Sequence, residues 1–211
     1  KKALILMQIN AGKFDEALAN AEKLRDEYPE NPYPLNLTAY IYLGQEKLEL
    51  AKQAFESALK IAPDDRLAAH SLAAMLIREG NNDSARELYQ QILKQNPGEL
   101  STLLQYARLE ALEGDAAQTN ELLDKAIEHN PGALKPRMLR ANYYIRMGQF
   151  DAAATLLREV EGDYSSNPEY LLAMGEAQLC IGKTSAGIET LRQLTTIDSF
   201  NSQAHYLLGG A

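Results

Sequence analysis

The sequence predicts an all-α fold, an α-solenoid of stacked antiparallel helical hairpins. Three observations lead to this prediction. Pairs of amphipathic segments of helical length follow one another along the chain, glycines or prolines separate most of them, and the pattern returns every 34 residues. One hairpin cannot bury its apolar face alone, so repetition at this period predicts hairpins that stack on their neighbours.

The segment 31–63 shows the repeating unit. Apolar residues recur three or four positions apart in each half, which gives each predicted helix one apolar face. Small Ala39 and Ala51 let the two backbones approach, and Phe55 fills the space beside them. Pro63 cannot continue the second helix and ends the unit.

Equivalent positions of successive units carry equivalent residue types, and a shift of 34 residues needs no insertion or deletion. The small residues of the second helices are Ala17, Ala51, Ala85, Thr119, Ala153 and Gly187, the closing prolines are Pro29, Pro63, Pro97 and Pro131, and the turn glycines are Gly12, Gly80, Gly114, Gly148 and Gly182.

The predicted repeats follow in order as one array. They are 1–31 (partial), 32–65, 66–99, 100–133, 134–167, 168–201 and 202–211 (truncated). Their predicted helices end near 10 and then span 14–27, 33–45, 48–61, 65–79, 82–95, 99–112, 116–129, 134–147, 150–161, 168–181 and 184–197. Because the outer repeats are incomplete, we expect a fragment of a longer array.

Composition restricts the function. The 211 residues carry a formal charge of −8 and a pI near 5.0, which argues against binding to a phosphate backbone. The single Cys180 cannot form an intrachain disulfide. No apolar run is long enough to span a membrane, and the first residues do not form a signal peptide.

Repeat 5 departs from the pattern, because Arg137 and Arg140 stand where apolar residues usually pack. One repeat earlier, Glu110 occupies another such position. One hypothesis is that Glu110 and Arg140 pair between adjacent first helices, since either charge alone would be costly to bury. The alternative is that both side chains reach solvent along their stems.

No motif in the sequence supports catalysis or metal binding. Gly182-Lys183-Thr184 ends like a phosphate-binding loop, but Ala177 replaces the required earlier glycine and the segment follows a helix. The three histidines belong to separate repeats and have no metal-ligand spacing. No base is expected next to Cys180. We therefore predict no enzyme activity, no metal and no cofactor.

The period, the motifs Ala51-x3-Phe55 with Pro63 and Ala85-x3-Tyr89 with Pro97, and the small residues of the first helices together resemble the tetratricopeptide repeat family. The tryptophan often found early in the first helix is absent. The resemblance covers essentially the whole chain. It implies a right-handed superhelix whose first helices line a concave groove for a protein or peptide partner.

Carried over position by position, the resemblance gives these groove residues: Tyr33, Asn36, Tyr40, Leu43, His70, Ile77, Arg78, Leu104, Arg108, Lys135, Met138, Asn142, Arg146, Glu169, Leu172 and Glu176. Arg78, Arg108 and Arg146 are expected to form a basic strip that suits an acidic peptide. The alternative is that these residues only cover the inner wall. The Lys and Asn pattern by which co-chaperone repeats grip a C-terminal carboxylate is absent.

Segments such as Tyr106-Ala107-Arg108-Leu109-Glu110 are also similar to bacterial repeat lipoproteins that accompany PEP-CTERM protein sorting and exopolysaccharide export. This narrower resemblance implies a non-enzymatic scaffold in the cell envelope, periplasmic or anchored to the outer membrane; a cytoplasmic location is the alternative. Two other functions stay open. The array could recruit substrates for an enzyme domain outside this sequence, or read RNA, although the groove residues show no repeating cationic code.

Overall fold

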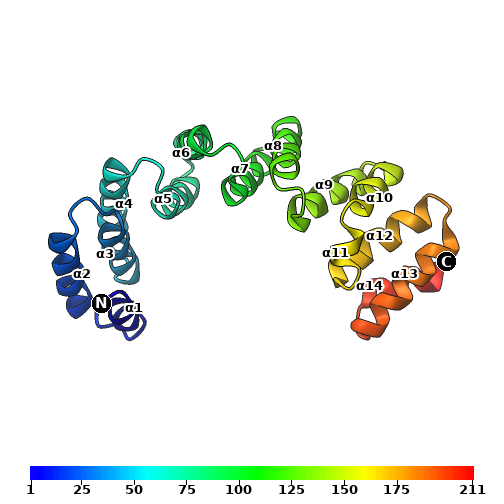
Figure 1. Ribbon diagram of the computed structural model, residues 1–211, viewed down its shortest axis with the longest axis horizontal. Helices are drawn as coiled ribbons and strands as arrows, with labels where there is room; N and C mark the ends of the chain where they lie inside the picture. Colours follow the sequence, from blue (N-terminus) through cyan, green and yellow to red (C-terminus); the bar gives the residue numbers. More distant parts are fainter. The chain divides into compact units, whose positions relative to one another are not determined.

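A computed structural model describes all residues from Lys1 to Ala211, and it contains fourteen helices and no strand (Figure 1). The helices divide between two compact units, Lys1–Leu109 and Glu110–Ala211. None of them combines the length and the hydropathy that a membrane span requires.

Unit 1 contains three hairpins and most of the next first helix. Its helices are α1 (Lys2–Asn10), α2 (Phe14–Glu27), α3 (Tyr33–Gly44), α4 (Leu48–Ile61), α5 (Arg66–Arg78) and α6 (Asn82–Gln95), and the unit boundary falls within α7 (Leu100–Glu113). Unit 2 continues with α8 (Ala116–His129), α9 (Leu134–Arg146), α10 (Phe150–Arg158), α11 (Glu161–Tyr164), α12 (Pro168–Cys180), α13 (Thr184–Ile197) and α14 (Ser202–Gly210).

The turns inside the hairpins share one backbone geometry. Gly12, Gly80, Gly114, Gly148 and Gly182 all have positive φ, between 69° and 83°. The amide after each glycine donates to a carbonyl five residues earlier, as Asn81 N does to Leu76 O at 2.8 Å. This bond satisfies one of the free carbonyls at the helix end, and glycine enters the left-handed conformation without a steric penalty. Repeat 2 makes the same turn with Glu46, at a φ of 58°.

Polar residues begin most of the first helices. The side chains of Asp65, Asn167 and Asn201 each accept a hydrogen bond from a backbone amide of the helix that follows. Glu99 does the same for Thr102 N at 2.6 Å. Such caps satisfy amides that the helix itself leaves without an acceptor. Ala133, at the equivalent position before α9, cannot cap.

The second helix of repeat 5 differs from the prediction. It was expected to run to residue 161, but α10 ends at Arg158 and the one-turn helix α11 follows. The break lets Val160 be buried, at 3% exposure, and places the Tyr164 hydroxyl where it donates to Gly132 O at 3.0 Å. In repeats 3 and 6 a glutamine of the second helix makes a comparable bond, Gln91 to Pro63 O and Gln193 to Ser165 O. Glu159 holds the position of these glutamines here, and its carboxylate has no hydrogen to donate.

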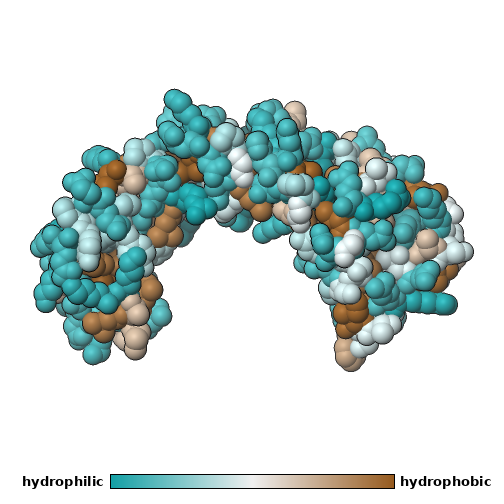
Figure 2. Space-filling model, in the orientation of Figure 1, coloured by the Kyte–Doolittle hydropathy of each residue, from teal (hydrophilic) through white to brown (hydrophobic).

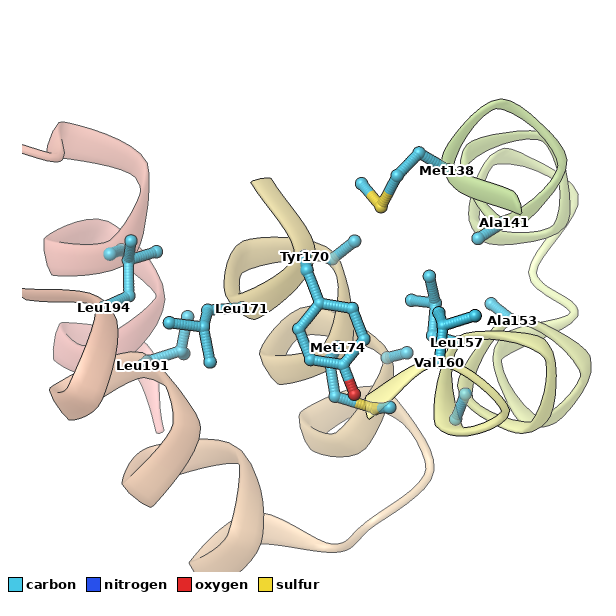
Figure 3. Packing of buried hydrophobic residues seen from close by; sticks show 14 residues of the cluster. Met138, Ala141, Ala153, Leu157, Val160, Tyr170, Leu171, Met174, Leu191 and Leu194 are labelled. Atoms are coloured by element: carbon cyan, nitrogen blue, oxygen red, sulfur yellow. The ribbon is translucent and has the colours of Figure 1, made fainter. Parts of the chain in front are cut away.

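The core of unit 2 is centred on α12. Figure 3 shows Tyr170 and Met174 of α12 between side chains of α9 and α10 on one side and Leu191 and Leu194 of α13 on the other. Gly175 lets α12 and α13 approach closely, since a Cβ there would lie 2.7 Å from Leu191 Cγ. Unit 1 has a smaller cluster, in which α1, α2 and α3 enclose Ile5, Ala17 and Ile41.

Candidate functional site

Hydrophilic residues cover most of the face of each unit that Figure 2 shows, and hydrophobic residues gather only in small patches. This face therefore offers no broad apolar contact surface. Eight of the predicted groove residues instead line local hollows on the first helices of the two units.

The largest group of predicted residues meets in unit 2. A hollow of about 680 Å³ lies among α9, α12 and α14. Six predicted groove residues line it: Lys135, Met138 and Asn142 from α9, and Glu169, Leu172 and Glu176 from α12. Residues that lie far apart in sequence are thus brought together by the stacking of two first helices.

The floor of the unit 2 hollow is apolar. Met138 and Ala173 are 8% and 4% exposed and belong to the core cluster of the unit, and Leu134 and Leu172 pack against that cluster. Sequence reasoning did not predict Leu134, Leu139, Ala173 or Gln203 as lining residues. The 34-residue period identifies equivalent positions. The orientation of each helix about its axis decides which side chain reaches the hollow, and the period does not give that orientation.

The rim of the hollow is charged. Lys135 and Asn142 are exposed on α9, while Glu169 and Glu176 lie on α12. The spacing 169, 172, 173 and 176 puts two carboxylates and two apolar side chains on one helix face.

Burial raises the pKa of the Cys180 thiol, and the nearby Glu176 carboxylate raises it further. The thiol is therefore held protonated at neutral pH and is not activated as a nucleophile.

A second hollow, of about 730 Å³, lies in unit 1. Tyr40 of α3 and His70 of α5 line it together with Asp64, Arg66 and Ser71. The Tyr40 hydroxyl lies 2.9 Å from Ser71 Oγ, and its ring meets Phe55 edge to face. Hydrogen bonds thus cross directly from one first helix to the next in this unit.

His70 belongs to a chain of polar contacts that joins α5 to α7. Its Nε2 lies 2.8 Å from Thr102 Oγ1, which in turn donates to Glu99 Oε2 at 2.6 Å. Arg66 Nη1 donates to Glu99 Oε1 at 2.7 Å. Thr102 uses its hydroxyl hydrogen for Glu99, so it accepts from His70, whose Nε2 must carry a hydrogen.

In this network of polar contacts, the pKa values of His70 and Glu99 shift for different reasons. Burial lowers the pKa of His70, and the Glu99 carboxylate only partly opposes this. Burial by itself would raise the pKa of Glu99. Hydrogen bonds from the Thr102 hydroxyl and amide and from Arg66 outweigh burial and keep that pKa below its usual value. At neutral pH the network therefore holds a neutral imidazole and an ionised carboxylate.

Asn36 is a correction to the predicted groove. It is 1% exposed, and its Nδ2 lies 3.1 and 3.2 Å from the two carboxylate oxygens of Asp65. The side chain therefore ties α3 to the start of α5 and does not face a ligand. The equivalent positions of later repeats, which include His70 and Met138, also lie along the seam between successive first helices. The next first helix therefore decides how much of each side chain stays accessible.

The remaining predicted residues lie outside both hollows. Tyr33, Leu43, Ile77 and Leu104 are half-buried. Arg78, Arg108 and Arg146 are exposed, the first two in unit 1 and the third in unit 2. Their accessibility suits the predicted contact with an acidic partner, and a strip formed by all three stays a prediction.

Arg140 takes a partner that the sequence hypothesis did not consider. Its Nε donates to Asp124 Oδ1 of α8 at 2.8 Å, and its guanidinium lies 4.3 Å from the ring centre of Tyr144. The side chain is only 13% exposed, so it does not reach far into solvent. Glu110, the hypothesised partner, is 3% exposed and has an interaction partner within the protein. Arg137 is also buried, with Nη2 3.2 Å from Glu159 Oε2.

Nothing in the arrangement of side chains forms a metal centre. No group of three or more His, Cys, Asp or Glu side chains is placed to hold an ion. The chemistry that both hollows offer is recognition through apolar contact, hydrogen bonding and charge.

Comparison with known sequences identifies the repeat. A profile of the tetratricopeptide repeat family matches residues 8–76 and 110–176, and a second profile of that family matches residues 68–109. No curated protein matches the chain.

Several solved structures share the fold. PilF of Pseudomonas aeruginosa has a TM-score of 0.70 at 12% identity, covering 99% of this chain and 95% of its own. PilW, a type IV pilus biogenesis factor, has a TM-score of 0.65 at 18% identity, with coverage of 98% and 96%. YrrB, a protein with an unusual peptide-binding site, has a TM-score of 0.63 at 14% identity, with coverage of 88% and 96%.

At these identities the likeness concerns the fold alone, an α-solenoid of helical hairpins. The family profiles rest on the sequence itself and cover most of it. The chain belongs to the tetratricopeptide repeat family, whose members generally act as protein interaction scaffolds.

Proposed function

We propose that this chain is a non-enzymatic scaffold that holds a protein or peptide partner in the hollow of unit 2. One observation carries the proposal. Six residues predicted from the repeat pattern converge from α9 and α12 on a single hollow with an apolar floor and a charged rim. Such a combination supports binding because the floor removes apolar partner surface from water while the rim fixes orientation.

The hollow is suited to side chains of a partner segment more than to a small molecule. It is open, and its floor is continuous with the core that α9 and α12 share. A rigid floor favours affinity, since little conformational freedom is lost there on binding. Arg78 and Arg108 of unit 1 are exposed and are proposed as a separate contact for acidic groups of a partner.

The proposed setting is the bacterial cell envelope, in a complex for polysaccharide export or protein sorting. The segments similar to PEP-CTERM-associated lipoproteins support this setting, and among the structural neighbours PilW is a pilus biogenesis factor. Fractionation of cells that express the full native protein tests it. Recovery with the envelope is expected, and recovery with the cytosol would contradict this part of the proposal.

Site-specific photo-crosslinking tests the contact surface. A photoreactive phenylalanine analogue replaces Leu172 in the hollow, or Glu189 on the exposed face of α13 as a control. A discrete crosslinked partner is expected from position 172 only. Equal yield of the same product from both positions would refute the hollow as the contact site.

A charge variant checks the result. Leu172→Asp places a carboxylate among the apolar contacts and should abolish capture of the partner by the otherwise unmodified chain. Circular dichroism and the melting temperature show whether the variant remains folded. Undiminished capture by a folded Leu172→Asp chain would also refute the proposal.

A further inference from the structure

We propose that the hollow of unit 2 selects a peptide segment in which a lysine or arginine side chain lies next to an apolar side chain. This inference rests on the proposed function and names the chemistry of its ligand. It differs from the acidic ligand expected for the arginines of unit 1, because the charges around the hollow have the opposite balance.

The unpaired acidic groups of the hollow carry the argument. Some carboxylates elsewhere in unit 2 form ion pairs, Asp124 with Arg140, Glu159 with Arg137 and Glu121 with Lys125. Glu169 and Glu176 line the hollow without such a partner. Against these two carboxylates the lining offers a single cation, Lys135. The local charge therefore favours a positively charged occupant.

The position of Glu176 strengthens this preference. It lies one turn before the end of α12 at Cys180, where the helix dipole is negative. A cationic side chain from a ligand would therefore be attracted to this end of the helix. Glu169 lies in the first turn of α12. Two carboxylate side chains thus flank the apolar face of the helix.

The apolar floor supplies the second half of the recognition. Leu172 and Ala173 lie between the two carboxylates along α12, and Met138 faces them from α9. A methionine side chain adapts to different apolar partners. A ligand side chain buried here places a neighbouring basic residue within reach of Glu169 or Glu176. The structure thus favours apolar and basic residues side by side.

Three pools of fluorescein-labelled nonapeptides test the inference. One pool combines leucine with lysine at randomised positions, a second combines leucine with glutamate, and a third combines serine with lysine. Fluorescence anisotropy with the 211-residue chain measures the dissociation constant for each pool. The leucine and lysine pool should bind tightest. Equal or tighter binding of the leucine and glutamate pool would overturn the inference.

Matched variants locate the effect. Glu169→Gln combined with Glu176→Gln should weaken binding of the leucine and lysine pool by about tenfold. Glu161→Gln combined with Glu189→Gln removes the same charge from exposed positions outside the hollow and should leave binding unchanged. An equal effect of both pairs would overturn the inference by showing that only net charge matters.

The outcomes separate the inference from the proposed function. Preference for the glutamate pool, with crosslinking at position 172 retained, refutes the ligand chemistry and leaves the peptide-binding function in place. Failure of every pool to bind, together with loss of crosslinking at that position, refutes both. Melting curves of each variant establish that the compared chains are equally folded.

Discussion

Successive first helices meet through polar groups in unit 1 and through apolar groups in unit 2. Between α3 and α5, Asn36 bonds to Asp65 and Tyr40 to Ser71. Between α9 and α12, Met138 and Leu172 instead border an open hollow. One repeat architecture thus supports two kinds of seam, because the hairpins are held together by their small and apolar positions and leave the seam positions free to vary.

The two kinds of seam differ in whether their side chains are engaged with each other or accessible to a ligand. In unit 1 the seam side chains are occupied by each other, as shown by the contacts that run from Arg66 through Glu99 and Thr102 to His70. In unit 2 the equivalent positions include Met138, Leu172 and Ala173, whose apolar side chains form no hydrogen bonds across the seam and leave room for a ligand. The first seam adds stability and orientation, and the second provides a binding surface.

Of the substitutions considered, Glu99→Ala in the polar seam of unit 1 should have the largest effect on stability. The carboxylate caps α7 through Thr102 N and accepts from the Thr102 hydroxyl in a buried position. Its loss leaves two buried donors without an acceptor, so unfolding should become easier by about 2–3 kcal/mol. Urea denaturation followed by circular dichroism measures this. Glu99→Gln keeps an acceptor oxygen and should lose less; equal stability of all three proteins would contradict the account.

Tyr170→Phe tests the apolar unit. The Tyr170 side chain is 1% exposed and its hydroxyl has no hydrogen-bond partner. Removing the hydroxyl should therefore stabilise the protein by about 1 kcal/mol. Burial, with help from Glu161, raises the pKa of Tyr170 to about 12.

The stability difference between Tyr170→Phe and the wild type should also depend on pH in the alkaline range. In the unfolded chain Tyr170 ionises near its ordinary pKa of 10.0, while the folded protein retains the proton. The wild type therefore loses stability as pH rises from about 10 toward 12, and the advantage of Tyr170→Phe should grow in that window. Thermal melts across it would contradict the burial argument if the two curves stayed parallel.

Ala133→Asp gives α9 the kind of side-chain cap that α5, α7, α12 and α14 already have. Asp65 and Glu99 cap the helices that follow them, whereas Ala133 cannot. An aspartate at the start of α9 should cap it and add about 0.5–1 kcal/mol of stability. Ala133→Leu serves as a control without capping ability. A gain from leucine equal to that from aspartate would show that packing, not capping, accounts for it.

The smallest expected effect concerns the pH response of His70. Its pKa in the fold is below the ordinary 6.5, so on acidification the unfolded chain takes up the proton first. The stability contributed by the neutral imidazole is complete above pH 6.5 and is lost as pH falls below it. His70→Gln should therefore flatten the decline in melting temperature between about pH 7 and 5. An unchanged slope would exclude His70 as its source.

The repeat pattern predicted the helices well because their ends depend on local chemistry. Glycine at the left-handed turn position and proline after the second helix act through the backbone of their own segment. The seventh first helix also begins where the pattern predicts, at Ser202. The early end of α10 was missed, since it accompanies the burial of Val160 and the hydrogen bond from Tyr164 to Gly132 of the preceding repeat, and neither can be read from the local pattern.

The candidate site was only partly predictable. Lys135, Met138, Asn142, Leu172 and Glu176 could be named from their register, and the structure gathers them in one hollow. Asn36 has the same register as Met138 and is closed off, because Asp65 happens to lie opposite it. A partner 29 residues away, at the start of the next first helix, cannot be read from the local pattern.

The sequence by itself determined the hairpins, their turns and the family, since these follow from local conformational preferences repeated at a constant interval. Only the tertiary structure decided which first-helix side chains pair across a seam, which carboxylates are left without a cation, and where a hollow remains. The physical reason is that burial and pairing depend on the distance between side chains of neighbouring repeats. Periodicity fixes the order of those side chains along the chain but not that distance.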